Sequence, residues 1–398
     1  MPKLQPRFDW LSDPRLGKIL DALGAEGSAK FVGGCVRDSL LGQSPLESDA
    51  IDIDIATDRT PDEMRALFGA AGIKAIATGE SHGTMTAVVD CLVAECTTLR
   101  RDVDTDGRHA DVQFTRDWEQ DWRRRDFTIN ALYTDRSGEI WDPAGGLGDL
   151  EGGVVEFIGE PSERIKEDAL RILRFFRFSA RFADTFDAAG LASIKQHTDL
   201  LDKLSRERVW SELSRTFSAS RSPEAMEEAA KAGVLQKLLP GEPRLEVFKR
   251  FRLTEITDLA ANLVALWPGL SKSVLRDRLR PSNDVIDTYQ SIEAAQEALR
   301  SGMSVHELLY RFQERVPYLA SQVALACGED VHTELITELR TSKSPQLPIR
   351  GQDIVDRGIN PGPEISKALA AFERLWLDAG VPDDLPTVER LLAEALGG

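Results

Sequence analysis

Cysteine, histidine and positive charge are scarce in this chain of 398 residues, and each shortage excludes a class of protein. The four cysteines have neither the density of a disulfide-built domain nor the spacing of zinc ligands. The five histidines form no His-x-x-x-His pair, so the sequence predicts no histidine-based metal site. A formal net charge of −17 argues against bulk electrostatic attraction to nucleic acid and predicts no DNA partner.

Long apolar runs are also missing. The apolar stretch Leu263–Trp267 is far too short to span a bilayer, and residues 1–7 contain no apolar core of a secretory signal. Together with cysteines that lack a pairing pattern, these features predict a cytoplasmic protein without a membrane partner. The hydrophobic fraction of 42% is ordinary for a folded protein, and 398 residues suffice for two or three domains.

Periodicity divides the chain into a mixed head and a helical remainder. Residues 1–150 alternate strand and helix signals, with a helix over Thr60–Ala71 capped by Thr60 and a loop over 101–111. Strands are expected at residues 30–32, 51–56, 84–90, 92–99 and 139–142. After residue 150 strand signals almost vanish, and one helix is expected over Ile165–Phe182. We therefore expect an α/β head, a small mixed sheet with helices, followed by a long all-α arm.

The pair Asp52 and Asp54 is the most informative local pattern. Both side chains project from the same face of the expected strand, because alternate residues in a strand point the same way. Neighbouring carboxylates resist ionising together, and a divalent cation relieves that repulsion. Oxygen ligands of this kind suit Mg²⁺ bridged to substrate phosphates. A solvated acidic strand edge is the alternative interpretation.

Two further features belong beside this pair in the expected sheet. Gly33 and Gly34 follow a strand and precede a helix, where backbone amides can hold phosphate oxygens and Arg37 can add a charged clamp. Glu95 lies in a β-favouring run that can pair with the strand of Asp52, and three carboxylates can hold two Mg²⁺ ions for an in-line phosphoryl displacement. The alternatives are an ordinary glycine turn and a lone acidic residue.

Arginines concentrate at residues 123–125 and 164–181, the two places where a protein of this charge is expected to bind RNA. In residues 124–130, Arg124 and Arg125 suit phosphates, and Asp126 suits a ribose hydroxyl. A surface charge cluster that caps a helix is the alternative for this segment.

Asp168 and Arg171 lie three residues apart in the expected helix, and therefore on one face. Asp168 can accept from the N4 amine of cytosine or the N6 amine of adenine, while Arg171 donates to the adjacent ring nitrogen. Guanine and uracil present a carbonyl and a ring N–H at those places, so acceptor would face acceptor. The pair can select C and A without a nucleic-acid template; a surface ion pair is the alternative.

Together these motifs resemble one family: the class II tRNA nucleotidyltransferases and bacterial poly(A) polymerases of the DNA polymerase beta superfamily. The resemblance covers about residues 30–215 in the family's motif order. It is carried by residues 33–38, 52–54, 82–84, 95–100, 124–130, 142–150, 167–171 and 207–213. A looser match at residues 347–365 resembles the family's tail.

The resemblance implies a polymerase-beta-like nucleotidyltransferase head over residues 1–150 and an all-α neck with nucleotide-selecting helices over 151–220. An all-α body and tail that bind tRNA would follow over 221–398. Catalysis is implied for Asp52, Asp54 and Glu95, with Mg²⁺ on Asp52 and Asp54. Nucleotide-binding roles are implied for Gly33, Gly34, Arg37, Arg125, Asp126, Asn130, Asp168, Arg171, Arg174 and Arg177.

The activity implied is template-independent addition of C, C and A to the 3′ end of tRNA from CTP and ATP. The alternatives are a poly(A) polymerase or A-only adder, and a non-catalytic RNA-binding homologue. Poly(A) polymerases tend to have Asp-Pro where this chain has Asp168-Ala169, which argues against polyadenylation. All the expected carboxylates are present, which argues against an inactive homologue. Residues 104–110 resemble the flexible loop of CCA-adding enzymes.

Overall fold

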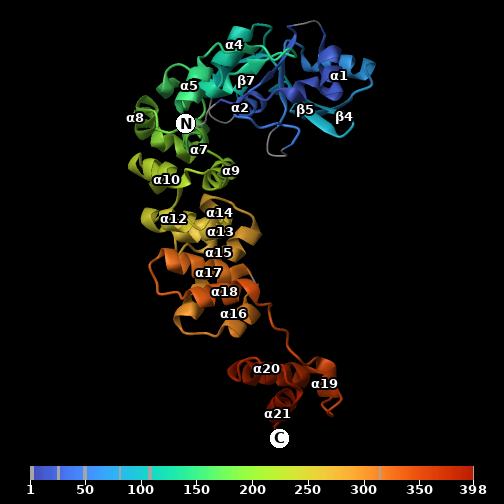
Figure 1. Ribbon diagram of the computed structural model, residues 1–398, viewed down its shortest axis with the longest axis vertical. Helices are drawn as coiled ribbons and strands as arrows, with labels where there is room; N and C mark the ends of the chain where they lie inside the picture. The colour runs from blue at the N-terminus through green and yellow to red at the C-terminus, as the bar shows by residue number, and fades with distance from the viewer. Residues whose placement is uncertain are drawn as a thin grey trace. The chain divides into compact units, whose positions relative to one another are not determined.

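The computed structural model describes residues 4–24, 27–47, 52–79, 82–105, 110–312 and 315–397. Contacts separate the chain into two compact units, Met1–Pro240 and Gly241–Gly398. The strands lie in the N-terminal unit, and the described part of the C-terminal unit is built from helices (Figure 1). Within the described ranges, no helix is both long and apolar enough to cross a membrane.

A seven-stranded mixed sheet forms the centre of the N-terminal unit, in the order β3-β4-β5-β2-β1-β8-β9. Its strands are β1 (Ala29–Val32), β2 (Asp54–Thr57), β3 (Lys74–Gly79), β4 (Thr84–Val89), β5 (Leu92–Thr98), β8 (Tyr133–Thr134) and β9 (Ile140–Trp141). β2 and β5 pair in parallel, and the other neighbours pair antiparallel. The parallel pair sets the start of β2 beside the middle of β5, which decides where the acidic residues meet.

Short helices accompany the sheet, and α1 and α3 pack against each other and against β4. They are η1 (Asp9–Ser12), α1 (Pro14–Leu23), α2 (Gly34–Leu40), α3 (Pro61–Ala70), α4 (Trp118–Arg123), η3 (Thr128–Asn130) and α5 (Gly146–Gly152). The start of α3 is set by a capping box: the Thr60 hydroxyl accepts from the Glu63 amide, and the Glu63 carboxylate accepts from the Thr60 amide. Pro61 fixes the first turn, as predicted.

Helices complete the N-terminal unit and build the C-terminal one. The first set is α6 (Pro161–Glu167), α7 (Leu170–Phe182), α8 (Ala188–His197), η4 (Thr198–Lys203), α9 (Arg206–Phe217), α10 (Ser222–Lys231) and α11 (Val234–Leu238). The second set is α12 (Leu245–Arg252), α13 (Leu259–Leu266), α14 (Lys272–Arg278), α15 (Asn283–Arg300), α16 (Val305–Arg311), α17 (Arg315–Ala326), α18 (Thr333–Thr341), α19 (Gly351–Val355), α20 (Pro363–Asp378) and α21 (Leu385–Ala395).

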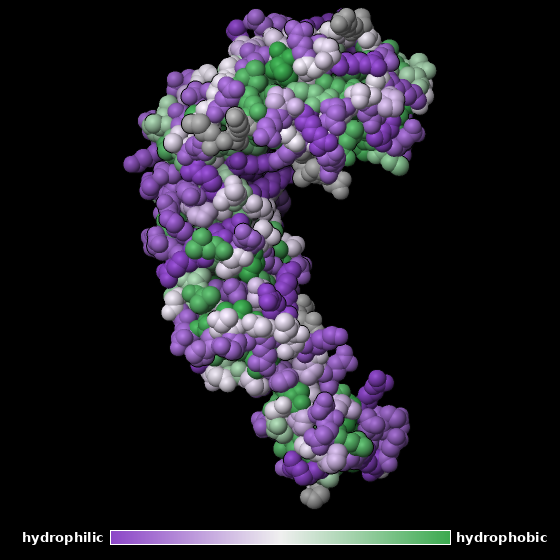
Figure 2. All heavy atoms as spheres, viewed as in Figure 1, coloured by the Kyte–Doolittle hydropathy of each residue, from purple (hydrophilic) through white to green (hydrophobic). Residues whose placement is uncertain are grey.

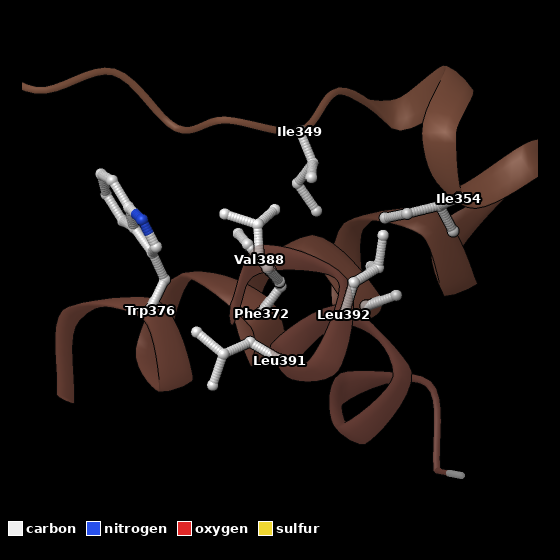
Figure 3. Close-up of a cluster of buried hydrophobic side chains, with 8 residues drawn as sticks. Ile349, Ile354, Phe372, Trp376, Val388, Leu391 and Leu392 are labelled. Carbon is white, nitrogen blue, oxygen red and sulfur yellow. The ribbon is translucent and has the colours of Figure 1, made fainter. Parts of the chain in front are cut away.

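The last three helices have a small core of their own, shown in Figure 3. Its buried side chains are Ile349, Ile354, Ala368, Phe372, Trp376, Val388, Leu391 and Leu392. Trp376 is anchored there because its indole N–H donates to the Pro382 carbonyl at 2.8 Å. Hydrophilic residues cover most of the visible face of both units (Figure 2), in keeping with a charged fraction of 29%.

The predicted fold class, an α/β head followed by helices, is confirmed. Two local predictions in the head are wrong, and a third is wrong in the helical part. The strand begins at Asp54, so Asp52 precedes it. The expected loop 101–111 contains an antiparallel pair, β6 (Arg100–Thr105) and β7 (Ala110–Phe114), because backbone hydrogen bonds across the pair need no side-chain periodicity. Residues 106–109, part of the segment compared with the family's flexible loop, lie outside the described residues.

The expected helix Ile165–Phe182 is interrupted between α6 and α7. Asp168 has extended backbone angles there, and its carboxylate accepts from the Leu170 amide at 3.0 Å. Aspartate favours such local bonds to the backbone over a helix interior. The break matters because Asp168 is one of the two residues expected to read the base.

Candidate active site

Two of the three expected catalytic carboxylates are neighbours across the parallel strand pair. Asp54 opens β2, and its register partner in β5 is Glu95. The Glu95 amide donates to the Ile53 carbonyl at 2.8 Å, which fixes the two strands at this point. Asp54 is half-buried, whereas Glu95 and Asp52 are exposed. The sheet therefore brings Asp54 and Glu95 together, with Asp52 two residues before Asp54 along the chain.

The Asp54 carboxyl is electrostatically unsatisfied. Burial is the main reason that its pKa is raised, to about 7, and Glu95 and Asp52 add to the increase. The guanidinium groups of Arg125 and Arg37 oppose it. Among the described residues, no donor hydrogen-bonds to this carboxylate.

This environment fits a divalent cation, since a positive ion would stabilise the ionised form. The described residues contain no set of three or more histidine, cysteine or acidic side chains preformed to hold a metal ion. A divalent cation bound here would therefore need ligands besides the side chains, such as substrate phosphates and water.

The glycine pair forms a tight turn between β1 and α2. Gly33 has φ of +73°, a conformation that strongly favours glycine, and its amide donates to the Leu132 carbonyl at 3.0 Å. A Cβ on Gly33 would lie 3.7 Å from the Asn130 carbonyl oxygen and 3.8 Å from the Arg125 guanidinium. The predicted phosphate-binding turn thus lies directly beside Arg125.

Arg37 and Asn130 join the turn to the rest of the site. Arg37 is buried, and its guanidinium donates to the Asn130 side-chain oxygen and to Asp38. Asp38 also pairs with Arg181 at 3.1 Å. Arg37 is therefore held in place by its neighbours, and its position comes from the fold.

Arg125 is oriented by Asp121, a residue that the sequence interpretation missed. Asp121 is 1% exposed, and its carboxylate accepts from Arg124 at 2.7 Å, from Arg125 at 3.1 Å and from the Tyr133 hydroxyl at 3.0 Å. Burial alone would raise the pKa of Asp121, but Arg125 and Arg124 outweigh it and lower the pKa to about 2. Asp121 lies on α4, four residues before Arg125, and this helical spacing could have revealed the pairing.

Asp126 is a second buried carboxylate between arginines. It accepts from Arg174 at 2.6 Å and from the Asn130 amide nitrogen at 3.0 Å. Burial would raise its pKa, but the charge of Arg174 and the hydrogen bond from Asn130 lower it to about 2. The structure thus brings together three of the expected nucleotide-binding residues.

Asp168 and Arg171 do not pair with each other through their side chains. Asp168 pairs with Arg208 of α9 at 2.7 Å, and both side chains are partly exposed. Arg171 pairs with Glu167 at 2.6 Å, and its other terminal nitrogen donates to the Arg124 carbonyl at 2.8 Å. The backbone of the break still connects them, since the Arg171 amide donates to the Asp168 carbonyl at 3.0 Å.

Arg174 and Arg177 line the next turns of α7 and share the buried Glu212 of α9. Arg177 lies 2.5 Å from this carboxylate, and Arg174 lies 3.8 Å from its other oxygen. Both guanidinium groups also stack on the Phe178 ring, that of Arg177 at 4.1 Å and that of Arg174 at 5.1 Å from the ring centre. Glu212 belongs to the motif at residues 207–213, so the sequence signal was present although no role was assigned to it.

Comparisons with known proteins agree with this geometry. Residues 29–156 match the family model described as "Poly A polymerase head domain", and residues 185–243 match "Probable RNA and SrmB- binding site of polymerase A". The chain is 33% identical to the mitochondrial CCA tRNA nucleotidyltransferase 1 of Mus musculus, over 95% of this chain and 90% of that protein. It is 31% identical to the CCA-adding enzyme of Limosilactobacillus fermentum, over 96% of each.

Among solved structures, the Bacillus stearothermophilus CCA-adding enzyme in complex with CTP is 28% identical, with a TM-score of 0.75. The similarity covers 96% of this chain and 97% of that one. Because relatives above 30% identity match nearly the whole length of the sequence, this chain belongs to the family of CCA-adding tRNA nucleotidyltransferases.

Proposed function

We propose that this enzyme adds C, C and A to the 3′ end of tRNA, using CTP and ATP with Mg²⁺ and no nucleic-acid template. The observation that carries the proposal is the combination, in one unit, of the Asp54–Glu95 pair with the arginine residues of α7. A relative at 33% identity is named for this activity, and the solved relative at 28% identity is a complex with CTP.

In this proposal the carboxylates of the sheet serve the chemical step. Asp52 and Asp54 would hold Mg²⁺, with Glu95 as the third carboxylate. Bound there, Mg²⁺ would supply Lewis-acid stabilisation of the phosphoryl group and lower the pKa of the attacking hydroxyl. Gly33, Gly34 and Arg125 would hold the triphosphate, because the turn leaves the Arg125 guanidinium beside the backbone.

The residues of the helical segment would choose the base. Arg171 is 8% exposed and fixed by Glu167 and the Arg124 carbonyl, so its direction is set before a nucleotide arrives. Asp168 is bound by Arg208, whose side chain is 42% exposed and free to move toward solvent. The amine of cytosine or adenine would replace Arg208 as the donor to Asp168. Arg37, Asp126, Asn130, Arg174 and Arg177 would hold these groups in position.

The proposal also assigns the parts of the chain and its compartment. Residues 1–150 would form the catalytic head, 151–220 the nucleotide-selecting neck and 221–398 the tRNA-binding body and tail. A cytoplasmic site of action is supported by four cysteines that are all free thiols.

Sequencing of reaction products tests the activity. The full-length enzyme is incubated with Mg²⁺, CTP, ATP and a tRNA transcript that ends at the discriminator base. The expected product carries C, C and A and then stops. A run of adenosines would replace this proposal by polyadenylation. No extension of this transcript, with addition of a single A to a second transcript that already ends in C and C, would replace it by A-only addition.

A further inference from the structure

The sheet face that carries Asp54 and Glu95 continues beyond them to the edge of the sheet. Residues that are register partners on neighbouring strands share a face. Glu95 is the partner of Thr86 in β4, and Thr86 is the partner of Ile76 in β3. One row of side chains therefore runs from Asp54 in β2 through β5 and β4 to β3. At roughly 4.8 Å between neighbouring strands, these three steps span about 14 Å.

A second row runs beside it, two residues nearer the β4–β5 hairpin. Val93 of β5 faces Val88 of β4, and Val88 faces Lys74 of β3. Val93 is 53% exposed and Ile76 42% exposed, unusual values for large apolar side chains in strands. On the opposite face Leu92, Ala94 and Cys96 are buried.

Hydroxyl groups flank Glu95: Thr86 is its register partner in β4, and Thr97 follows it by two residues in β5, on the side away from Val93. The hydroxyls of Thr78 and Thr86 are 2.8 Å apart, and those of Thr84 and Thr97 are 3.0 Å apart. Each hydroxyl can donate one hydrogen bond and accept others. Thr86 is buried, whereas Thr84 and Thr97 are partly exposed. This half of the sheet face therefore offers the Thr84 and Thr97 hydroxyls on one side of Glu95 and aliphatic surface on the other, with Lys74 exposed at the edge strand.

The strand order decides which substrate meets this face. The triphosphate-binding turn follows β1, and β1 lies on one side of β2 while β5 and β4 lie on the other. An in-line displacement places the attacking and leaving oxygens on opposite sides of the reacting phosphorus. With the triphosphate toward β1, the attacking hydroxyl arrives from the side of β5.

We propose that the face formed by Lys74, Ile76, Val88 and Val93, here called the acceptor face, binds the last unpaired nucleotides of the RNA that is extended. The inference rests on the proposed function. Aliphatic side chains contact bases without reading their edges, and Lys74 suits a phosphate. Such a surface tolerates the change of the terminal base after each addition, which a strand receiving C, C and A requires.

The test places a negative charge on the acceptor face. Val93→Glu alters an exposed side chain, so the fold has room for it. Ala66→Glu is the matched control: it adds the same charge at an exposed position of α3, which contacts β3 and β4 from the buried side of the sheet. Val93→Ile keeps the apolar surface. For each variant, KM and kcat are measured separately for the tRNA transcript and for CTP.

Val93→Glu is expected to raise KM for the transcript roughly tenfold, because the carboxylate repels RNA phosphates. The increase in KM for the transcript should exceed any change in KM for CTP, and Ala66→Glu should leave KM for the transcript at the wild-type value. Val93→Ile should raise KM for the transcript less than Val93→Glu does. An unchanged KM for the transcript, or an equal increase with Ala66→Glu, would overturn the inference.

A binding measurement separates this inference from the proposed function. A fluorescent single-stranded RNA that ends in C and C is titrated with each full-length protein, without nucleotide, by fluorescence anisotropy. Weaker binding by Val93→Glu alone supports the acceptor face even if the wild type adds a different sequence of nucleotides. A wild-type dimer that Val93→Glu converts to a monomer would show instead that a second copy of the chain covers this face, and would overturn the inference.

Discussion

The two halves of the candidate active site differ in whether their buried carboxylates have partners of opposite charge. On the sheet, Asp54 lies beside Glu95 without a hydrogen-bond donor among the described residues. Around α4 and α7, every buried carboxylate already contacts arginines, as Asp121 and Asp126 show. Under the proposed function, a bound cation completes the first half. The second is rigid beforehand and positions its donors through the fold.

This contrast separates two kinds of mutational effect. Loss of a sheet carboxylate should reduce the chemical step and leave the fold intact, because no donor in the described part of the chain hydrogen-bonds to the carboxylate of Asp54. Loss of an acid in the arginine network should reduce stability, because a buried guanidinium loses its counter-charge.

Asp54→Asn should lower the rate of CTP incorporation by roughly a thousandfold or more, since loss of a metal ligand removes several kcal/mol of transition-state stabilisation. Single-turnover kinetics with saturating tRNA measures this rate, and circular dichroism checks the fold. Near-normal turnover in a correctly folded variant would show that the catalytic metal lies elsewhere.

Asp126→Ala should destabilise the N-terminal unit by about 3–5 kcal/mol, because it leaves Arg174 without its closest carboxylate. Urea denaturation measures the change. Glu119→Ala is the matched control, since it removes the carboxylate from the Arg123–Glu119 pair, in which both side chains are about two-thirds exposed. The control should change stability little. Equal losses in the two variants would contradict the importance of burial.

Protonation of Asp121 should make the enzyme less stable in acid. Its pKa of about 2 in the folded protein lies below the ordinary 3.8, so the folded state binds fewer protons than the unfolded state between these values. The stabilisation is therefore present above about pH 4 and is lost as the pH falls toward 2, a change of about 2 kcal/mol. Denaturation of wild type and Asp121→Asn between pH 5 and pH 2 should give a flatter curve for the variant; parallel curves would remove Asp121 as the cause.

Arg208→Ala should have the smallest effect on stability. The Arg208–Asp168 pair is partly exposed, and such pairs contribute at most about 1 kcal/mol. If an incoming base replaces Arg208 as the donor to Asp168, the variant should bind CTP and ATP at least as tightly as the wild type. A KM for CTP that rises tenfold would mean that Arg208 itself holds the nucleotide.

The sequence alone predicts those parts of the candidate site whose residues lie within one short motif. Local spacing predicted roles for the carboxylates, the glycine turn and Arg171, whereas roles for Arg174 and Arg177 were predicted only from the family resemblance. The sequence could not show which group each arginine contacts, because these contacts join residues more than forty positions apart. Arg174 donates to the Asp126 carboxylate, and Arg171 donates to the Arg124 carbonyl. The helix break at Asp168 was missed because the apolar periodicity continues through it, whereas the decisive bond is from one amide to one side chain.

Incorporation of all four nucleotides by Asp168→Ala and Arg171→Ala, compared with Asp54→Asn, tests the division of labour most directly. Each nucleotide is supplied alone, at matched concentration, to tRNA lacking its end, under single-turnover conditions. The account predicts that Asp54→Asn slows all nucleotides by the same factor. It predicts that Asp168→Ala and Arg171→Ala shift the ratio of CTP to UTP by roughly tenfold to a hundredfold toward UTP. A uniform loss with an unchanged ratio in Asp168→Ala and Arg171→Ala would contradict it.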